Sequence, residues 1–290
     1  MKKLTRNSSS VVISAALLLM FFGHVSMGFA QSTPRRSLLA LSKADHMLVI
    51  VDPATLKILA RIPVGQDPHE VIASSDGTKA FVSIYGGGGL HELDVLDLVA
   101  QKPLRTVDTR PLFGPHGLSF VNGKAWFTAE GSKAVGRLDP ATGQVDWAMG
   151  TGQDRTHMIY VSPDGKMICT TNVNSGTVSI LTDTILQPGR PGPRGAPPRR
   201  YWHQTIIPVE RGSEGFDVSP DGRQLWTAAS EDGSIFIIDL ASEKLITRLD
   251  AKVTVANRLK FTPDGARVFV SSLSSGEVTV LDTRTRKEIK

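Results

Sequence analysis

Cysteine is almost absent from this chain, because Cys169 is the only one among 290 residues. A single cysteine excludes an intramolecular disulfide, and it also excludes c-type haem attachment, which needs two cysteines before a histidine. We interpret Cys169 as a small buried hydrophobic residue rather than a reactive thiol. The fold must therefore be held together by its core, and a hydrophobic content of 40% is typical of a globular protein.

Long hydrophobic runs are also missing. The apolar stretch from Val11 to Phe22 is shorter than the roughly 20 residues that span a bilayer. It follows three basic residues and precedes several small ones, which is the pattern of a secretory signal peptide. We therefore expect residues 1–30 to be a signal peptide and residues 31–36 a flexible segment. The protein is then periplasmic or secreted, with no membrane span after cleavage.

Without this leader, the chain carries almost no excess of charge of one sign. The formal net charge falls from +5 to +2, because Lys2, Lys3 and Arg6 leave with the leader. So small a balance gives no argument for nucleic-acid or membrane binding by the whole protein.

One segment, residues 187–200, is locally basic and rich in proline and glycine. It is followed by Tyr201 and Trp202, and basic residues beside aromatic ones suit single-stranded nucleic acid. A segment of this composition is more often a solvated loop, and we favour that interpretation. Nucleic-acid binding stays an alternative that depends on Arg190, Arg194, Arg199 and Arg200.

The chain contains an internal repeat that is marked by Asn-Gly and Asp-Gly pairs. Their glycines are separated by 46, 42, 57 and 43 residues, and the interval of 57 becomes 43 without the 14 residues of the insertion at 187–200. The five pairs are Asp76-Gly77, Asn122-Gly123, Asp164-Gly165, Asp221-Gly222 and Asp264-Gly265.

Each repeat reads as four short strands. An apolar strand leads into the Asn/Asp-Gly pair, which predicts a two-residue hairpin turn because these residues accept the positive φ that such a turn requires. A second strand, a glycine-containing loop, a third strand and a fourth strand follow. Four antiparallel strands in a repeat of roughly 40–45 residues are typical of one propeller blade. The sequence therefore predicts an all-β propeller over residues 37–290.

The repeat resembles that of the YVTN-type β-propeller proteins over essentially the whole chain after the leader. Ser162-Pro-Asp-Gly-Lys, followed by Cys169-Thr-Thr-Asn172 and Ser175-Gly-Thr-Val-Ser-Ile, carries the resemblance. No unit has a complete Tyr-Val-Thr-Asn. We align its first position with Cys169 in one unit and with an aromatic residue in the others: Phe81, Phe127, Trp226 and Phe269.

The resemblance implies roughly seven blades, and the sequence supplies fewer. Five units have a first strand, whereas the opening segment, Ser37 to Pro63, has only strands two to four. A propeller usually closes by borrowing the missing inner strand from its other end. The sequence stops at Lys290, within the fourth strand of its last unit. We therefore expect a C-terminally incomplete version of a seven-bladed propeller.

Histidine recurs at one position of the repeat. This position lies seven residues before the turn aspartate, or six residues before Asn122, at the start of the first strand. First strands line the central channel of a propeller, so we expect these residues, with Glu70 and Arg258 beside them, to surround one mouth of the channel. The five residues at this position are His69, His116, His157, Glu214 and Asn257.

Three interpretations of this arc of five residues around the channel mouth remain open. The histidines can be structural, since repeats share ancestry and buried polar side chains are usually hydrogen-bonded. The arc can bind a small molecule, a peptide or a protein. It can also hold a divalent metal ion, with His69, His116 and His157 as candidate ligands. We favour the second interpretation, a non-enzymatic binding or scaffold protein that uses the channel mouth.

An enzyme is the alternative. Gly114-Pro-His-Gly-Leu118 resembles the Pro-His-Gly stretches of streptogramin-lyase-like and lactonase-like propellers, in which histidines and acids at the channel mouth work with a metal. That resemblance implies His116 and His157 as base or ligand, and Glu70 or Glu214 as ligand or acid.

Overall fold

The computed structural model describes residues 36–186 and 199–290, all of which belong to one unit, residues 32–290. The predicted signal peptide lies outside the described residues, as do Arg190 and Arg194 of the insertion. In the described part of the chain no helix is long and apolar enough to cross a membrane. The helices described there are two short 3-10 turns, η1 (Gly86–Gly88) and η2 (Glu130–Ser132), so the all-β prediction is confirmed.

The described strands form one three-stranded sheet and five four-stranded antiparallel sheets. The three-stranded sheet contains β1 (Leu38–Ser42), β2 (Met47–Val51) and β3 (Ile58–Pro63). The next two sheets contain β4 (Pro68–Ala73), β5 (Lys79–Ile84), β6 (Glu92–Asp97) and β7 (Lys102–Asp108), then β8 (Pro115–Val121), β9 (Lys124–Ala129), β10 (Ala134–Asp139) and β11 (Gln144–Gly150). The third four-stranded sheet contains β12 (Thr156–Val161), β13 (Met167–Asn172), β14 (Thr177–Leu186) and β15 (Arg199–Pro208). The last two contain β16 (Ser213–Val218), β17 (Gln224–Ala229), β18 (Ile235–Asp239) and β19 (Lys244–Leu249), then β20 (Ala256–Phe261), β21 (Arg267–Ser272), β22 (Val278–Asp282) and β23 (Lys287–Glu288).

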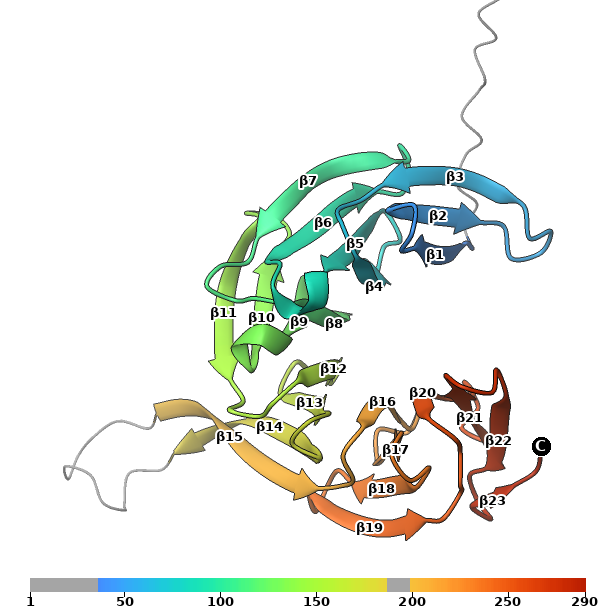
Figure 1. Ribbon diagram of the computed structural model, residues 1–290. Helices are drawn as coiled ribbons and strands as arrows, with labels where there is room; N and C mark the ends of the chain where they lie inside the picture. The colour runs from blue at the N-terminus through green and yellow to red at the C-terminus, as the bar shows by residue number, and fades with distance from the viewer. Residues whose placement is uncertain (1–35, 187–198) are drawn as a thin grey trace, which may run out of the picture. The chain divides into compact units, whose positions relative to one another are not determined.

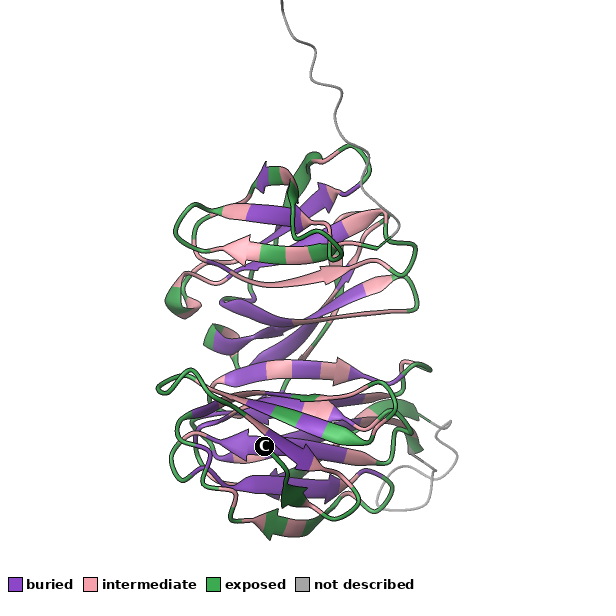
Figure 2. Ribbon diagram, turned by 90° about the vertical axis from the view of Figure 1, so that its right-hand side faces the viewer, coloured by how far each residue is buried: buried purple, intermediate pink, exposed green. Residues whose placement is uncertain are grey.

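The first strand of each four-stranded sheet lies innermost and contacts the first strand of the next sheet: β4 with β8, β8 with β12, β12 with β16, and β16 with β20 (Figure 1). Second strands such as β5 and β9 are buried along almost their whole length, whereas the outer strands β7 and β19 are largely exposed (Figure 2). The core lies between neighbouring sheets, as Phe81 of β5 and Phe127 of β9 share one cluster. Burial of each such side chain contributes about 1.5–3 kcal/mol.

All five predicted Asn/Asp-Gly turns are present, but the two-residue form was predicted correctly only for Asn122-Gly123. There both residues have positive φ, 53° and 73°, and strand pairing resumes on either side. At the four Asp-Gly sites the glycine has positive φ and the aspartate does not. The glycine N–H instead bonds the carbonyl three residues earlier, as from Gly77 to Ser74 at 2.9 Å. These four turns are therefore longer than the sequence pattern suggested.

A serine or threonine two residues before each aspartate explains the longer turn. The carboxylate of Asp76 accepts a hydrogen bond from the Ser74 hydroxyl at 2.5 Å and another from the Thr78 N–H at 3.0 Å. The Ser74 bond, followed by those from Thr78, lowers the pKa of Asp76 to about 2. The same two bonds recur at Asp164, Asp221 and Asp264. The aspartate recurs because it closes the turn.

The strand register corrects one aligned position of the repeat. Ser119 of β8 pairs with Trp126, as Ile72 of β4 pairs with Phe81, so Trp126 rather than Phe127 occupies the aromatic position. The shorter Asn-Gly turn caused the shift of one residue. Cys169 fills this position in β13; it is fully buried, and burial raises the pKa of its thiol.

Candidate functional site

Each first strand of the four-stranded sheets has a β-bulge at its start. In β4 the two residues His69 and Glu70 lie opposite the single residue Ser83 of β5. A bulge adds one residue to a strand and redirects its side chains. In the other four first strands, the first residue of the bulge is also one of the recurring polar residues, namely His116, His157, Glu214 and Asn257. The local backbone thus turns one polar position per sheet towards the centre.

Hydroxyl groups on the second strands hold these bulges. Thr128 Oγ1 accepts a hydrogen bond from the N–H of Gly117 at 2.8 Å and donates to the carbonyl of His157, in the next sheet, at 2.5 Å. Gly117 leaves no room for a side chain, because a Cβ there would lie 2.5 Å from the same His157 oxygen. This close approach of β8 and β12 places His116 next to His157.

The structure brings the predicted site residues together. His116 lies between the other two histidines, with its ring centroid 4.3 Å from that of His69 and 3.9 Å from that of His157. Beyond His157, Glu214 Oε2 lies 3.8 Å from His157 Nε2 and accepts a hydrogen bond from Asn257 Nδ2.

An ion pair joins the first and last of the four-stranded sheets. Arg258 Nη2 donates to Glu70 Oε1 at 2.6 Å, although the two residues are 188 positions apart. Arg258 Nη1 lies 3.7 Å from Glu214 Oε2. We call the connected group the central cluster; its predicted members are His69, Glu70, His116, His157, Glu214, Asn257 and Arg258.

Three residues that the sequence analysis missed complete the central cluster. Tyr85 and Glu130 each directly follow a second strand, and Tyr85 Oη donates to Glu130 Oε2 at 2.5 Å. Arg155 precedes β12, and its guanidinium lies 3.0 Å from Glu214 Oε1 and 3.7 Å from Glu130 Oε1. Position in the repeat is the signal for Tyr85 and Glu130, because loops that follow second strands end on the same face as the starts of the first strands. Arg155 lies on that face because it directly precedes a first strand.

The buried part of the central cluster contains both a neutral ring and an ionised carboxylate. Burial, followed by the charge of His157, lowers the pKa of His116 far below its ordinary value. Burial also raises the pKa of Glu130, but the hydrogen bonds from His157 and Tyr85 outweigh this effect, and the net shift is downward. His69 lies nearer the rim, where Lys43 Nζ contacts its Nδ1 at 3.0 Å.

Unpartnered polar atoms are concentrated in this cluster. Among residues 36–186 and 199–290, six buried side-chain nitrogens make no hydrogen bond, and four of them are His116 Nδ1, His116 Nε2, His157 Nε2 and Arg258 Nη1. Such atoms are rare, because each costs about 1–3 kcal/mol. The structural interpretation, in which the recurring ring bonds a neighbouring backbone, does not describe His116.

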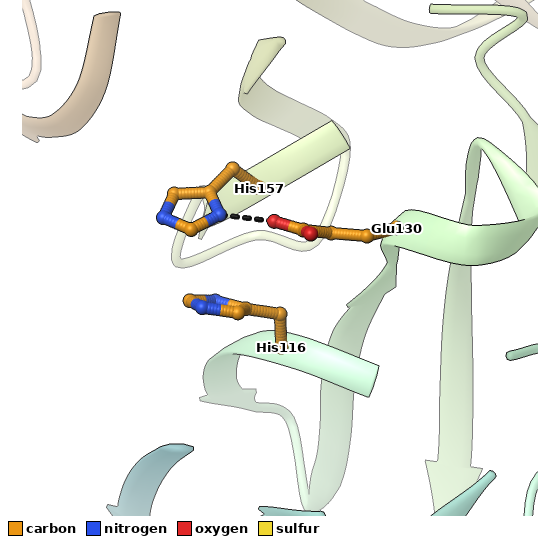
Figure 3. A group of neighbouring side chains, drawn as sticks. All are labelled: His116, Glu130 and His157. Atoms are coloured by element: carbon orange, nitrogen blue, oxygen red, sulfur yellow. Dashed lines mark hydrogen bonds and ion pairs between the residues drawn. The ribbon is translucent and has the colours of Figure 1, made fainter. Parts of the chain in front are cut away.

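The side chains of His116, Glu130 and His157, from β8, η2 and β12, lie close together, with the Glu130 carboxylate directed at His157 (Figure 3). One ligand atom from each of His116, Glu130 and His157 lies within 4.8 Å of the others, and all three residues are buried. A hydrogen bond joins Glu130 Oε1 and His157 Nδ1. Of the predicted metal candidates, His116 and His157 belong to this group, whereas His69 does not.

The described end of the basic insertion packs against the protein. Arg200 makes an ion pair with Asp183 at 2.6 Å, and the Trp202 ring lies 5.3 Å from that of Trp147. These rings line a cleft of about 590 Å³ between the β8–β11 and β12–β15 sheets. Because Asp183 pairs with Arg200, this end offers nucleic acid less free charge than the sequence suggested. Nucleic-acid binding there stays the less favoured alternative.

Comparison with known proteins supports the fold. One similar solved structure is hydrazine synthase of Kuenenia stuttgartiensis, with a TM-score of 0.67 over 85% of this chain and 80% of that chain. This chain is a β-propeller. At 18% identity the similarity concerns the propeller fold alone. No protein-family model matches the sequence. A search of curated proteins also found no match.

Proposed function

We propose that this chain is an exported β-propeller of the YVTN type that binds a small anionic ligand at the central cluster. The leader pattern of residues 1–30 supports export. The four-strand repeat supports the family. The propeller fold fits a binding or scaffold role, because its inner strands hold side chains from several sheets around one space.

Arg258 is the observation that carries this proposal. Its Nη2 donates to Glu70, whereas Nη1 is buried, makes no hydrogen bond and lies 3.7 Å from Glu214 Oε2. A guanidinium presents a planar fork of donors that matches a carboxylate or a phosphate. A ligand oxyanion at Nη1 would satisfy this donor. Arg155, which pairs with the other oxygen of Glu214, is the second arginine of the central cluster.

Anion binding to metal-free protein tests the proposal. We expect inorganic phosphate, succinate or citrate to raise the Tm of EDTA-dialysed protein and to bind in a calorimetric titration. Arg258→Gln should weaken that binding at least about tenfold, because a hydrogen bond to a charged group contributes about 1.5–3 kcal/mol. Arg223→Gln is the matched control, since the Arg223 side chain is 82% exposed at an Asp-Gly turn. Equal affinity in both variants, or no binding of any of these anions, contradicts the proposal.

A metal-dependent lyase-like or lactonase-like enzyme is a second candidate, and the grouping of His116, Glu130 and His157 favours it. An enzyme of this kind needs an ion with a free coordination position beside a bound substrate. Turnover of simple lactones by zinc-loaded protein, lost in His157→Ala, would support this candidate over binding alone.

A further inference from the structure

We infer that His116, His157 and Glu130 form a binding site for one divalent transition-metal ion, for which zinc suits the ligands best. The site spans the β8–β11 and β12–β15 sheets and uses none of the atoms that carry the anion proposal. Two imidazoles and a carboxylate are a ligand set that holds zinc and leaves a fourth position open. Imidazole nitrogen also favours zinc over the hard cations magnesium and calcium.

The unpartnered nitrogens are the first support for this site. Both ring nitrogens of His116 and Nε2 of His157 are buried without a hydrogen bond. A neutral imidazole always has one nitrogen with a free lone pair, which either accepts a hydrogen bond or binds a metal. One ligand atom from each of His116, Glu130 and His157 lies within 4.8 Å of the others, so one ion can bind a His116 nitrogen that makes no hydrogen bond within the protein.

Hydrogen bonds hold two of the three ligands, and none holds the third. Tyr85 Oη holds Glu130 through Oε2, which leaves Oε1 facing His157. Hydrogen bonds of this kind orient metal ligands. The His116 and His157 rings are tilted by 36°, so their in-plane lone pairs converge only after one ring rotates. His116 is the ring that rotates, because no hydrogen bond holds it.

Charge near the site is balanced rather than repulsive. Arg155 opposes a cation, since its Nε lies 3.7 Å from Glu130 Oε1. Its closer contact, however, is with Glu214 at 3.0 Å, and Arg258 is paired with Glu70 at 2.6 Å. Both arginines are therefore matched by other acids, and the negative charge of Glu130 is available to the ion.

Metal analysis of the full chain tests this inference. After dialysis against EDTA, the protein is mixed with zinc chloride, desalted and analysed for bound metal. We expect one zinc per chain, no retained magnesium, and at least about 100-fold weaker zinc binding in the double variant His116→Ala/His157→Ala. His203→Ala is the control, because His203 is an exposed histidine on β15, and it should bind zinc like the wild type. Less than one-tenth of a zinc per wild-type chain, or equal retention by the double variant, overturns the inference.

A spectroscopic measurement on the wild type covers the case in which the double variant does not fold. Zinc should shift the ring nitrogen signals of His116 and His157 in ¹H–¹⁵N spectra and leave those of His46 and His203 unchanged. Zinc-induced shifts that are confined to the exposed histidines would contradict the proposed site. The anion test is made on metal-free protein, so a failure of either proposal leaves the other one testable.

Discussion

A recurring polar residue lies at each end of the first strands: one at the start of the strand, near the centre, and one in the turn that follows the strand. The hydrogen bonds of these two residues differ. At the turn end, the carboxylate of Asp76 accepts bonds from the Ser74 hydroxyl and the Thr78 N–H, and three further turns repeat this pattern. At the central end, His157 bonds Glu130 and Asn257 bonds Glu214, and both partners lie outside the residue's own sheet. The side chain of His116 makes no hydrogen bond. The recurring turn residue is therefore satisfied within its own turn, whereas the recurring central residue depends on residues outside its own sheet or, at His116, has no hydrogen-bond partner.

We interpret this difference as one between a residue that recurs for folding and one that recurs for the proposed binding. A residue whose hydrogen bonds are complete within its own turn needs no other partner. A buried residue with none lowers the stability of the protein, and a ligand, an ion or a bound water compensates for it. Repetition in the sequence looks the same in both cases, and the hydrogen-bond partners distinguish them.

The largest expected effect on stability comes from a glycine at the central end. Gly117→Ala places a Cβ 2.5 Å from the carbonyl oxygen of His157 and 2.8 Å from the Cα of Met158. We expect the free energy of unfolding in urea to fall by about 3 kcal/mol, since overpacking against backbone is poorly relieved. Gly150→Ala is the control, because a Cβ there meets nothing within 4 Å. Equal effects of the two substitutions would contradict the close approach of β8 and β12.

A smaller loss of stability is expected at the turn end. Gly222 has a φ of +71°, and a Cβ there meets nothing within 4 Å, so Gly222→Ala acts through backbone strain alone. The left-handed conformation costs a non-glycine residue about 1–2 kcal/mol. Urea unfolding should show this loss while zinc and anion binding stay as in the wild type. A change in binding would mean that the two ends are coupled.

Replacement of His116 itself should stabilise the metal-free protein. His116→Leu keeps a buried side chain and removes two nitrogens that make no hydrogen bond, so we expect a gain of about 1 kcal/mol in EDTA, together with weaker zinc binding. Thermal unfolding of both proteins, with and without zinc, measures this. A destabilised leucine variant would show that the imidazole has a partner in the folded protein, and the structural interpretation would then hold.

The smallest expected effect concerns pH at the turn end. The pKa of Asp76 is lowered to about 2, so the ionised carboxylate stabilises the folded protein above its ordinary pKa of about 4, and this contribution is lost as the pH falls through about 2. Ser74→Ala removes the main cause and should raise the pKa of Asp76 in an NMR titration, with no change at Asp264, whose hydroxyl partner is Thr262. An unchanged Asp76 titration would contradict this explanation of the recurring aspartate.

The sequence predicted the four-strand repeat and seven of the ten residues of the central cluster. Periodic turns and alternating strands report the fold directly, so the four-strand repeat and the shared position of His69, His116 and His157 followed from spacing. The length of the turns was missed, because it depends on the hydroxyl of Ser74 and its equivalents rather than on the Asp-Gly pair. Glu130 and Arg155 were missed because they lie outside the repeated histidine position, and contact between neighbouring sheets brings them in.

X-ray absorption at the zinc edge, recorded on the full chain with one equivalent of zinc, tests most directly whether the central end of the first strands is a binding end. Imidazole rings give characteristic outer-shell scattering, whereas carboxylate and water ligands do not. We expect two imidazoles with one or two oxygens at about 2.0–2.2 Å, and one imidazole fewer in His116→Leu. A spectrum of oxygen ligands without imidazole scattering, or one that is the same in His116→Leu, would contradict a metal site at His116, His157 and Glu130.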